Sequence, residues 1–384
     1  MLEVVYWGFD GLDVAFQGAL RRDLVAILDE AKARAQAQAR PVLIEYRAAR
    51  FVLAETGAPN GYAFRCDSGH DGAIWFFKRG MSGADWNIRV SVKSLALALY
   101  GLGGVRARLY AFLADVCEMV GVESIGRVDY AVDVLAPHLV LVPEYFVMHS
   151  HTDRRDHIEP TEMEVGGKSS RVTSVTVGHM PRRQIIVYDK RAEVVQKHKV
   201  HWWEIWNEAR RLQSKPELDP TDGVRSRVWR VEVRVGKDHL WERWRIRRWS
   251  DLDEKIGDVL SAALAAIRYA LPGDDTNRSR WANHLLWDVV ANKLTSDLFE
   301  MTCGAQPSRV KQVMREHLHE TIAKQIIGSA ATLSIAAGVP DEEVRDVPDA
   351  LSTLLDNFIR ERPERFQEKR ARAAERYDFS NLRR

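Results

Sequence analysis

Tyr188 closes an apolar run that begins at residue 185 and has basic residues on both sides, among them Arg183 and Lys190. A tyrosine that attacks a phosphodiester must lose its phenolic proton, and the negative charge of the phosphate must be compensated. We therefore predict Tyr188 as a nucleophile whose phenolate is stabilised by Lys190, by Arg183 or by a metal ion. The alternative is a packed aromatic side chain, because strand alternation puts Tyr188 on the same face as Ile186.

Two aspartates lie four residues apart in the segment GRVDYAVDV, residues 126–134. This segment alternates with period two, as a strand does, so Asp129 and Asp133 point to one face together with Arg127. Carboxylates on one face of a sheet are costly unless they pair with cations or hold a metal ion. A structural arginine–aspartate pair and a metal site are both compatible with this pattern.

A second charged face occurs in the segment RVWRVEVRV, residues 227–235. Strand alternation places Arg230, Glu232 and Arg234 on one side and the valines on the other. The alternative to a functional site is an exposed ladder of salt bridges across neighbouring strands.

The tyrosine, the acids and the arginines together provide the parts of a phosphoryl-transfer site. Such a site needs a hard cation on the phosphate oxygens, acids to hold that cation, basic groups and an aligned nucleophile. We predict that Asp129, Asp133 and Glu232 hold Mg²⁺ or Mn²⁺ close to Tyr188.

Three motifs carry a resemblance to a known family. GRVDYAVD, TVGHMPRRQIIVYDK and WRVEVRV occur in this order and resemble the R-x-D-x-x-x-D, Gly-Ser-then-YDK and R-x-E-x-R signatures of the plasmid and phage replication initiation factor family. The segments YWGFDGLDVAF and NIRVSVKSL are similar to its first and mid-domain strands, so the resemblance covers roughly the first 250 residues. The chain departs from the family where Gly178 is followed by His179 instead of serine.

The resemblance implies a rolling-circle replication initiator or relaxase of a plasmid, phage or integrative element. Such a protein nicks one strand of single-stranded or extruded origin DNA and forms a 5′-phosphotyrosine and a free 3′-hydroxyl. The family also implies a divalent metal, and a host helicase is implied by the resemblance alone. Residue by residue, Tyr188 matches the nucleophile, and Asp129, Asp133 and Glu232 match the acidic positions.

Basic and aromatic residues alternate around residues 225–249. Cations that follow a phosphate backbone and aromatic rings that stack on bases are the two parts of a single-strand binding surface. The alternative is that the tryptophans pack a helix onto the sheet. The predicted DNA contacts are Arg127, Arg182, Arg230, Arg234, Trp241, Trp244 and Arg245.

Hydrophobic periodicity predicts an α+β fold, an antiparallel β-sheet with covering helices followed by a helical C-terminal domain. Helical patterns cover residues 17–40 and 105–120, strand patterns recur between residues 42 and 135 and again between 174 and 236, and residues 149–170 are expected to form a loop. We predict a catalytic domain at residues 1–249. Residues 250–384 form the predicted helical domain, a candidate DNA-recognition unit with a charged tail.

Composition limits the other possibilities. Lys and Arg (56) barely exceed Asp and Glu (54), so any affinity for nucleic acid must come from local patches. The 3 cysteines are far apart, which argues against a disulfide framework and favours the reducing cytoplasm. The N-terminus lacks a signal-peptide pattern, and no long apolar run indicates a membrane span. Oligomeric state is not indicated.

Two rival hypotheses involve no chemistry. One is a DNA-binding protein of a mobile element, such as a repressor or partition-like factor, that uses the same basic surfaces. The other is a scaffold protein in which the acidic and basic faces simply pair. Both predict that Tyr188→Phe leaves the behaviour of the protein unchanged, whereas a nicking enzyme would lose strand cleavage.

Overall fold

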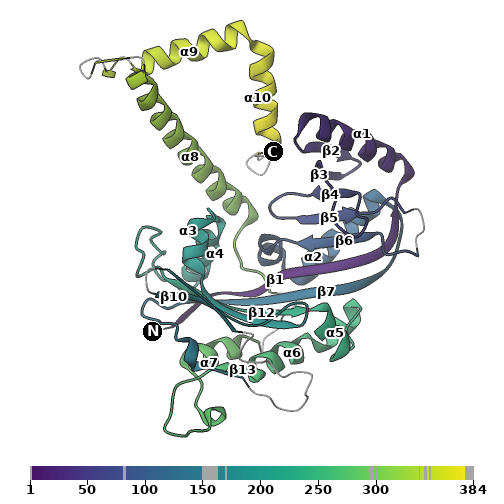
Figure 1. Ribbon diagram of the computed structural model, residues 1–384, viewed down its shortest axis with the longest axis vertical. Coiled ribbons are helices and arrows are strands. Elements are labelled where there is room, and N and C mark those ends of the chain that lie inside the picture. Colours follow the sequence, from purple (N-terminus) through teal and green to yellow (C-terminus); the bar gives the residue numbers. More distant parts are fainter. Residues whose placement is uncertain are drawn as a thin grey trace. The chain divides into compact units, whose positions relative to one another are not determined.

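The computed structural model describes residues 2–80, 84–148, 163–168, 171–294, 298, 301–336, 338–340, 344–345 and 347–376. It contains a large antiparallel sheet, helices that cover this sheet and a C-terminal helical region (Figure 1). The α+β class predicted from the sequence is therefore confirmed.

One sheet of 11 strands forms the body of residues 1–305, in the order β2-β3-β4-β5-β6-β1-β7-β12-β11-β10-β9. Every pair of neighbouring strands in this sheet is antiparallel. Its strands are β1 (Glu3–Leu20), β2 (Val42–Tyr46), β3 (Ala49–Leu53), β4 (Phe64–Asp67), β5 (Ala73–Phe77), β6 (Ile88–Val92), β7 (Cys117–Leu135), β9 (Met163–Lys168), β10 (Arg171–Gly178), β11 (Arg183–Asp189) and β12 (Val228–Gly236). A separate two-stranded sheet pairs β8 (Phe146–Met148) with β13 (Ile267–Tyr269).

The two long strands β1 and β7 pair along nearly their whole length and join the two halves of the sheet. Their register shifts at several points, one of which lies between Phe9 and Gly11. Asp10 occupies this irregularity, and an extra residue in a strand changes the direction of its side chain. The bulge is therefore the local reason why Asp10 can join a site on the sheet.

Helices lie on both sides of the sheet. In Figure 1, α3 (Lys190–Gln196) and α4 (His201–Leu212) lie on one side of the β9–β12 end, and α5 (Lys237–Glu242), α6 (Trp249–Ala266) and α7 (Leu285–Ala291) lie on the other. The helices α1 (Arg22–Gln38) and α2 (Ser94–Val116) share one apolar core with α5, α6 and α7. Short 3₁₀ turns occur at η1 (Pro143–Tyr145), η4 (Arg278–Arg280) and η5 (Asn292–Leu294).

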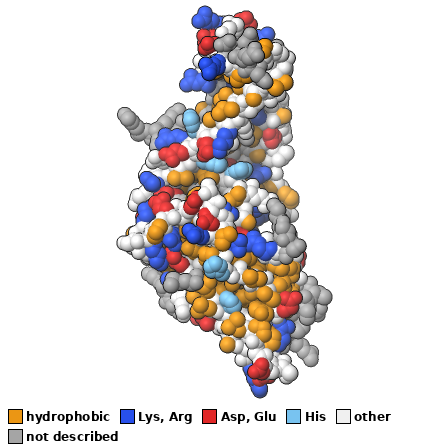
Figure 2. Space-filling view, turned by 90° about the vertical axis from the view of Figure 1, so that its left-hand side faces the viewer, with side chains coloured by type: hydrophobic (Ala, Val, Ile, Leu, Met, Phe, Trp, Pro, Cys, Tyr) orange, Lys and Arg blue, Asp and Glu red, His pale blue; other side chains and the backbone are white. Residues whose placement is uncertain are grey.

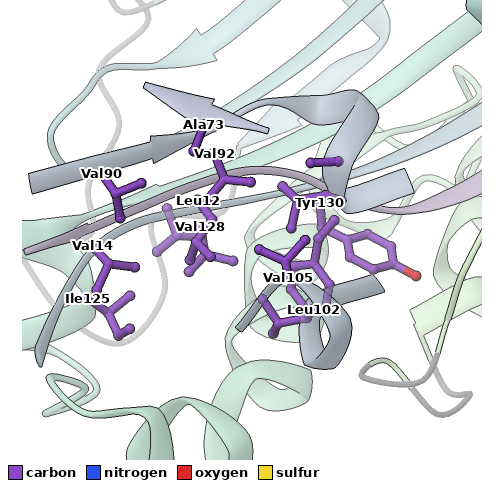
Figure 3. Close-up of a cluster of buried hydrophobic side chains, with 14 of the residues drawn as sticks. Leu12, Val14, Ala73, Val90, Val92, Leu102, Val105, Ile125, Val128 and Tyr130 are labelled. Carbon is purple, nitrogen blue, oxygen red and sulfur yellow. The ribbon is translucent and has the colours of Figure 1, made fainter. Parts of the chain in front are cut away.

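Alternation along the strands separates an apolar face from a polar one. Figure 3 shows part of the apolar face, where Leu12 and Val128 of neighbouring strands lie beside Leu102 and Val105 of α2. These side chains are buried, and burial of apolar area is the main favourable term in folding. The apolar face thus anchors the sheet, and the opposite face is left to carry charged residues.

The second compact unit comprises residues 306–384 and is helical where it is described. Its helices are α8 (Pro307–Ala336), α9 (Val347–Glu361) and α10 (Pro363–Arg376). The compact units meet at residue 305, whereas the sequence analysis placed the boundary near Trp249. The reason is that α6 buries Leu252, Ile256 and Leu260 in the core of the sheet and so belongs to the first unit.

Most expected strands are present, but several boundaries differ. The first strand continues to Leu20, so its helix begins at Arg22 instead of residue 17. The α2 helix covers residues 94–116, and β7 follows at Cys117, earlier than the expected start at residue 125. Of the expected loop at residues 149–170, residues 149–162 and 169–170 lie outside the described part, and residues 163–168 form β9.

The surface in Figure 2 shows lysine and arginine side chains interspersed with acidic ones, in keeping with the near balance of charges in the sequence. Among the described residues, no helix is long and apolar enough to cross a membrane.

Candidate active site

The register of four neighbouring strands brings the sequence motifs onto one face of the sheet. Tyr188 on β11 lies opposite Arg230 on β12, which lies opposite Asp133 on β7, and Asp133 lies opposite Tyr6 on β1. Two residues further along β12, Glu232 points to the same face. The candidate active site is therefore assembled by strand pairing between segments that are distant in the sequence.

The Tyr188 hydroxyl lies between the carboxylate of Glu232 and the ammonium group of Lys190. It donates to Oε2 of Glu232 at 3.2 Å, and Nζ of Lys190 lies 3.4 Å from the same oxygen. Burial raises the pKa of Tyr188 well above its ordinary value, even though the Arg230 guanidinium acts in the opposite direction. The resting phenol thus keeps its proton, and Glu232 is placed to accept it.

Glu232 is 1% exposed and is held in place by a second contact. Nε of Arg234 donates to Oε1 of Glu232 at 2.6 Å, so each carboxylate oxygen has one partner. The Arg234 side chain is half-buried, with 29% of its surface exposed. This arginine can therefore turn toward solvent or a bound anion without leaving the sheet.

Arg230 is fully buried and is the centre of an ionic network. Its Nε and Nη2 donate to the two oxygens of Asp133 at 2.5 and 2.8 Å, and its Nη1 donates to Asp10 at 2.6 Å. The Trp206 indole donates to Asp133 at 2.8 Å, and the guanidinium lies 4.2 Å from the ring centroid of Trp202. Because a buried charge is tolerated only when it is paired and hydrogen-bonded, this network fixes the row of residues that contains Tyr188.

Asp10 illustrates the balance of charges in this network. Burial alone would raise the pKa of the Asp10 carboxyl, but the charges of Arg230 and Lys190 outweigh burial and lower it. Asp10 is therefore ionised in the folded protein and shares the charge of Arg230 with Asp133.

Lys190 begins α3 immediately after β11 and is 2% exposed. Its ammonium donates to Glu193 at 2.6 Å and lies 4.8 Å from the ring centroid of Trp202. Burial lowers the pKa of Lys190, and the charge of Arg230 adds to this effect. A lysine of this kind can offset negative charge on the Tyr188 oxygen.

Asp129 lies on the same face, next to a small cavity. Its two oxygens accept from Nε and Nη2 of Arg127 at 2.8 and 2.5 Å. Burial raises the pKa of Asp129 to about 7, Arg127 lowers it, and the nearby charge of Glu232 raises it again. A Cβ atom on Gly11 would lie only 2.3 Å from Oδ2 of Asp129, so the close approach of β1 and β7 requires glycine at this position.

The cavity beside Asp129 has a volume of about 200 Å³. It is lined by both acidic and basic side chains of this face, and it extends from β12 across β7 to β1 and β6. The charged residues that line it are Asp10, Asp13, Arg127, Asp129, Glu232 and Arg234. This mixture can receive an anion on its arginines and a cation on its carboxylates.

The fit of a divalent cation differs among the three acids proposed from the sequence. Asp133 accepts from Arg230 and Trp206, is fully buried and is not among the residues that line the cavity, so it does not fit as a ligand. Asp129 and Glu232 are also paired with arginines, but they lie at the cavity. Asp129 and Glu232 line the cavity and supply the oxygen donors that Mg²⁺ and Mn²⁺ prefer. Within the described residues, no group of three or more His, Cys, Asp or Glu side chains is arranged to hold a metal ion.

Other residues proposed from the sequence lie away from Tyr188. Arg183 begins β11, five residues from Tyr188, and its side chain is buried on the opposite face because five is an odd number of strand residues. Arg182 is exposed in the turn between β10 and β11, and so is His179. The structure therefore leaves Lys190 as the cation beside the phenol.

The tryptophans expected to contact DNA lie on the side of the sheet that α5, α6 and α7 cover (Figure 1). The α5 helix packs Leu240 into the apolar core, and Trp244 packs against the same core. Trp241 lies under two arginines, with ring-to-guanidinium distances of 5.0 Å for Arg245 and 3.5 Å for Arg247. These residues form a surface separate from the Tyr188 face.

Several site residues were not identified from the sequence. Tyr6 and Asp10 belong to the opening segment YWGFDGLDVAF, and Trp206 and Glu193 belong to the helices that follow β11. The closely spaced glycines at positions 8 and 11 were a usable signal, because glycines inside a strand often mark a bulge or a close backbone approach.

The chain is similar to a known protein among solved structures. No protein-family model matches the chain, and no curated protein matches it. Among solved structures, the chain is similar to a rolling circle replication initiator protein from Geobacillus stearothermophilus, with 12% sequence identity and a TM-score of 0.41. The similarity covers 80% of this chain and 100% of that chain. At this TM-score the similarity assigns neither a family nor a function.

Proposed function

We propose that this protein nicks one strand of DNA through a tyrosine nucleophile, as a rolling-circle replication initiator or relaxase does. The observation that carries the proposal is the position of the Tyr188 hydroxyl, 3.2 Å from Glu232 and 3.4 Å from Lys190. The order of the three sequence motifs supports the same activity.

The proposed reaction is a transfer of the phosphoryl group from the DNA strand to Tyr188. The phenolic oxygen forms a bond to phosphorus, and the bond between phosphorus and the 3′-oxygen breaks. The phenolic proton passes to Glu232, and the leaving 3′-oxygen takes a proton from water. The products are a 5′-phosphotyrosine and a free 3′-hydroxyl.

The cations around Tyr188 have different roles in this proposal. Arg230 is occupied by two carboxylates, so it positions the row of residues that contains Tyr188. Lys190 offsets charge on the phenolic oxygen. Arg127 and Arg234 are half-buried at the cavity and are the candidates for contact with the scissile phosphate.

A divalent cation, Mg²⁺ or Mn²⁺, is part of the proposal, and Asp129 and Glu232 are the residues that would hold it. When bound, such an ion neutralises charge on the phosphate oxygens and polarises the phosphorus. Equilibrium binding of Mn²⁺, followed by calorimetry, is expected to weaken in Asp129→Asn and to persist in Asp189→Asn. Equal affinity in the two variants would remove Asp129 from the site.

The substrate and partners follow from the same proposal. Single-stranded or extruded origin DNA fits a nucleophile held in the interior of a sheet face, and a host helicase would act on the strand that nicking releases. The helices of residues 306–384 are a candidate unit for recognition of double-stranded DNA. Any DNA contact of Arg182, Trp241, Trp244 or Arg245 would lie outside the Tyr188 face.

A DNA-binding protein without chemistry is the second candidate. The observation that favours it is that Asp129, Asp133 and Glu232 each form an ion pair with an arginine, which a structural role would also produce. This candidate needs neither a reactive Tyr188 nor a cation.

Covalent capture separates the two candidates. The protein is incubated with Mn²⁺ and end-labelled single-stranded oligonucleotides that tile the DNA beside its own gene, and the products are run on a denaturing SDS gel. The proposal predicts a labelled protein band for the wild type and for Tyr145→Phe, a half-buried tyrosine in η1, and none for Tyr188→Phe. A band that survives in Tyr188→Phe would refute Tyr188 as the nucleophile.

A further inference from the structure

The sheet face that carries Tyr188 continues beyond the candidate active site onto β6, β5 and β4. Asp13 on β1 lies opposite both Arg127 on β7 and Ser91 on β6, so the register connects the two halves of the sheet. The cavity beside Asp129 is itself lined by Asp13 and Ser91. The active-site face and the outer strands therefore form one continuous surface.

This outer part of the face is accessible within the first unit. On β5, Ala73, Trp75 and Phe77 are buried toward the core, whereas Ile74 and Phe76 alternate with them and are half-exposed. The same alternation leaves Arg89 of β6 and Arg65 of β4 exposed. The side chains on this face are thus positioned to contact a ligand that lies across the strands.

A row of three residues crosses these strands. Phe76 lies directly opposite Arg65 on one side and Arg89 on the other. The Arg89 guanidinium lies 5.4 Å from the centroid of the Phe76 ring. An aromatic ring flanked by cations on a sheet face provides both a stacking platform and contacts for phosphates.

A second aromatic ring extends the row. Tyr62, in the connection between β3 and β4, packs edge-on against Phe76 with 6.0 Å between the ring centroids. The ammonium of Lys78 lies 5.2 Å from the centroid of the Tyr62 ring, and Tyr62 is half-exposed. We call the five residues Tyr62, Arg65, Phe76, Lys78 and Arg89 the outer-sheet cluster.

The charges near the cluster favour an anionic ligand. Within the cluster there are cations and aromatic rings but no acid. Asp13 pairs with Arg89 at 3.4 Å, at the edge of the cluster toward the cavity. The neighbouring acid Asp67 is occupied by Lys93 at 2.6 Å.

We infer that the outer-sheet cluster binds the single-stranded DNA that leads to Tyr188, an inference that rests on the proposed function. Bases stack on Phe76 and Tyr62, and Arg65, Lys78 and Arg89 contact the phosphates. Following the strand register, the row of residues through Tyr188 meets β1 at Tyr6, whereas the row through Arg89 meets β1 at Ala15. The cluster and the phenol are therefore separated by about 30 Å along the strands as well as about 20 Å across them, so the DNA would cover on the order of 35 Å. This span sets a minimum length for a substrate that reaches both the cluster and Tyr188.

Binding can be tested without knowledge of the origin sequence. Fluorescence anisotropy of a labelled 20-nucleotide oligo(dT) is measured on the full chain carrying Tyr188→Phe, so that covalent capture does not contribute. In this background, Phe76→Ala together with Tyr62→Ala is expected to weaken binding about 10- to 100-fold, because stacking by each aromatic residue contributes substantially. Trp281→Ala is the matched control, since Trp281 is also half-exposed and lies 5.0 Å from an arginine, Arg278. It is expected to leave affinity unchanged.

A second variant distinguishes a loss of DNA contacts from misfolding of the protein. Arg65→Gln with Arg89→Gln changes exposed side chains only and is expected to reduce the slope of log affinity against log salt by about one to two. The inference would be overturned if the double arginine variant had the same affinity and the same salt slope as the Tyr188→Phe background protein. It would also be overturned if a folded Phe76→Ala, Tyr62→Ala variant had the same affinity as that background protein. Loss of binding that the control shares to the same extent would overturn it as well.

The inference and the proposed function fail in different ways. If oligo(dT) binding depends on the outer-sheet cluster but no SDS-resistant adduct forms with any DNA, the nicking function is wrong and the binding surface stands. If adducts form through Tyr188 while the cluster variants bind and react as the background protein does, the surface is wrong and the nicking function stands.

Discussion

Replacement of Glu232 by glutamine tests the role of the acid beside Tyr188. The side chain keeps its size, and its carbonyl oxygen can still accept from Arg234, which now contacts it at 2.6 Å. What is lost is the negative charge that accepts the phenolic proton. The half-buried Arg234 side chain can turn toward solvent, so we expect the fold to be retained.

The expected effect is large on chemistry and small on binding. Removal of a positioned general base costs typically 10²–10⁴-fold in rate, so covalent adduct formation is expected to slow by about this factor. Since burial raises the pKa of Tyr188, the phenolate is scarce near neutral pH. The residual rate of Glu232→Gln is therefore expected to rise about tenfold for each pH unit, because only the phenolate then attacks.

The assay is single-turnover formation of the adduct on a reactive origin oligonucleotide, measured between pH 6 and pH 9 at fixed Mn²⁺. Glu204→Gln is the matched control, because Glu204 is also a buried carboxylate paired with an arginine, Arg211 at 2.5 Å, and does not contact Tyr188. A Glu232→Gln protein that is folded, binds DNA and reacts within about threefold of the wild-type rate would refute the role of Glu232 as base. Full recovery of the rate at high Mn²⁺ would show that Glu232 acts through the cation instead.

Three further predictions concern the stability of the site. Gly11→Ala places a Cβ atom 2.3 Å from Oδ2 of Asp129 and is expected to destabilise the fold by about 1–3 kcal/mol in urea unfolding. Gly126→Ala on β7, whose Cβ atom would lie 3.4 Å from its nearest neighbour, the Asp13 carbonyl oxygen, lacks this clash and is the control. Equal stability of Gly11→Ala and the wild type would contradict the close approach. Asp133→Ala leaves the buried Arg230 with Asp10 as its remaining carboxylate in the network. This change is expected to lower the free energy of unfolding by roughly 3–5 kcal/mol in the same measurement. A decrease below about 1 kcal/mol would show that the network is not rigid. The pKa of Asp129 is raised from 3.8 to about 7, so between these pH values the folded state holds a proton that the unfolded state releases, and the contribution of Asp129 to stability falls as the pH rises. The difference in unfolding free energy between the wild type and Asp129→Asn is therefore expected to change with pH in this range. A difference that is independent of pH would contradict the raised pKa.

The core of the site was accessible to sequence reasoning because strand periodicity is short and regular. Alternation placed Arg230 and Glu232 on one face of their segment, and the structure has them on one face of β12. It also placed Asp129 and Asp133 together. The pairing of β7, β12 and β11 as neighbours could be anticipated from the motifs, since a site for phosphoryl transfer needs all of them within a few ångströms.

Other parts of the site depended on pairing that the sequence does not encode locally. Asp10 reaches Arg230 because the register shifts between Phe9 and Gly11, and such a bulge exists only once β1 pairs with β7. The separation of Arg183 from Tyr188 was, in contrast, recoverable, because five strand residues reverse the face. Proximity in sequence to the tyrosine was the misleading signal there.

The domain boundary could not be inferred because it depends on where a helix packs. The α6 helix is amphipathic, and its sequence is equally compatible with a separate helical domain and with a cover for the sheet. The deciding contacts are non-local, between α6 and the core below β7 and β12. Only the fold shows that the compact unit continues to residue 305.

The most direct measurement of the central claim is the chemical identity of the linkage. The DNA–protein adduct is digested with nuclease and protease, and the modified peptide is sequenced by mass spectrometry. The account predicts a nucleotide joined through its 5′-phosphate to Tyr188. A nucleotide on any other residue, or a nicked DNA product without a protein linkage, would contradict it.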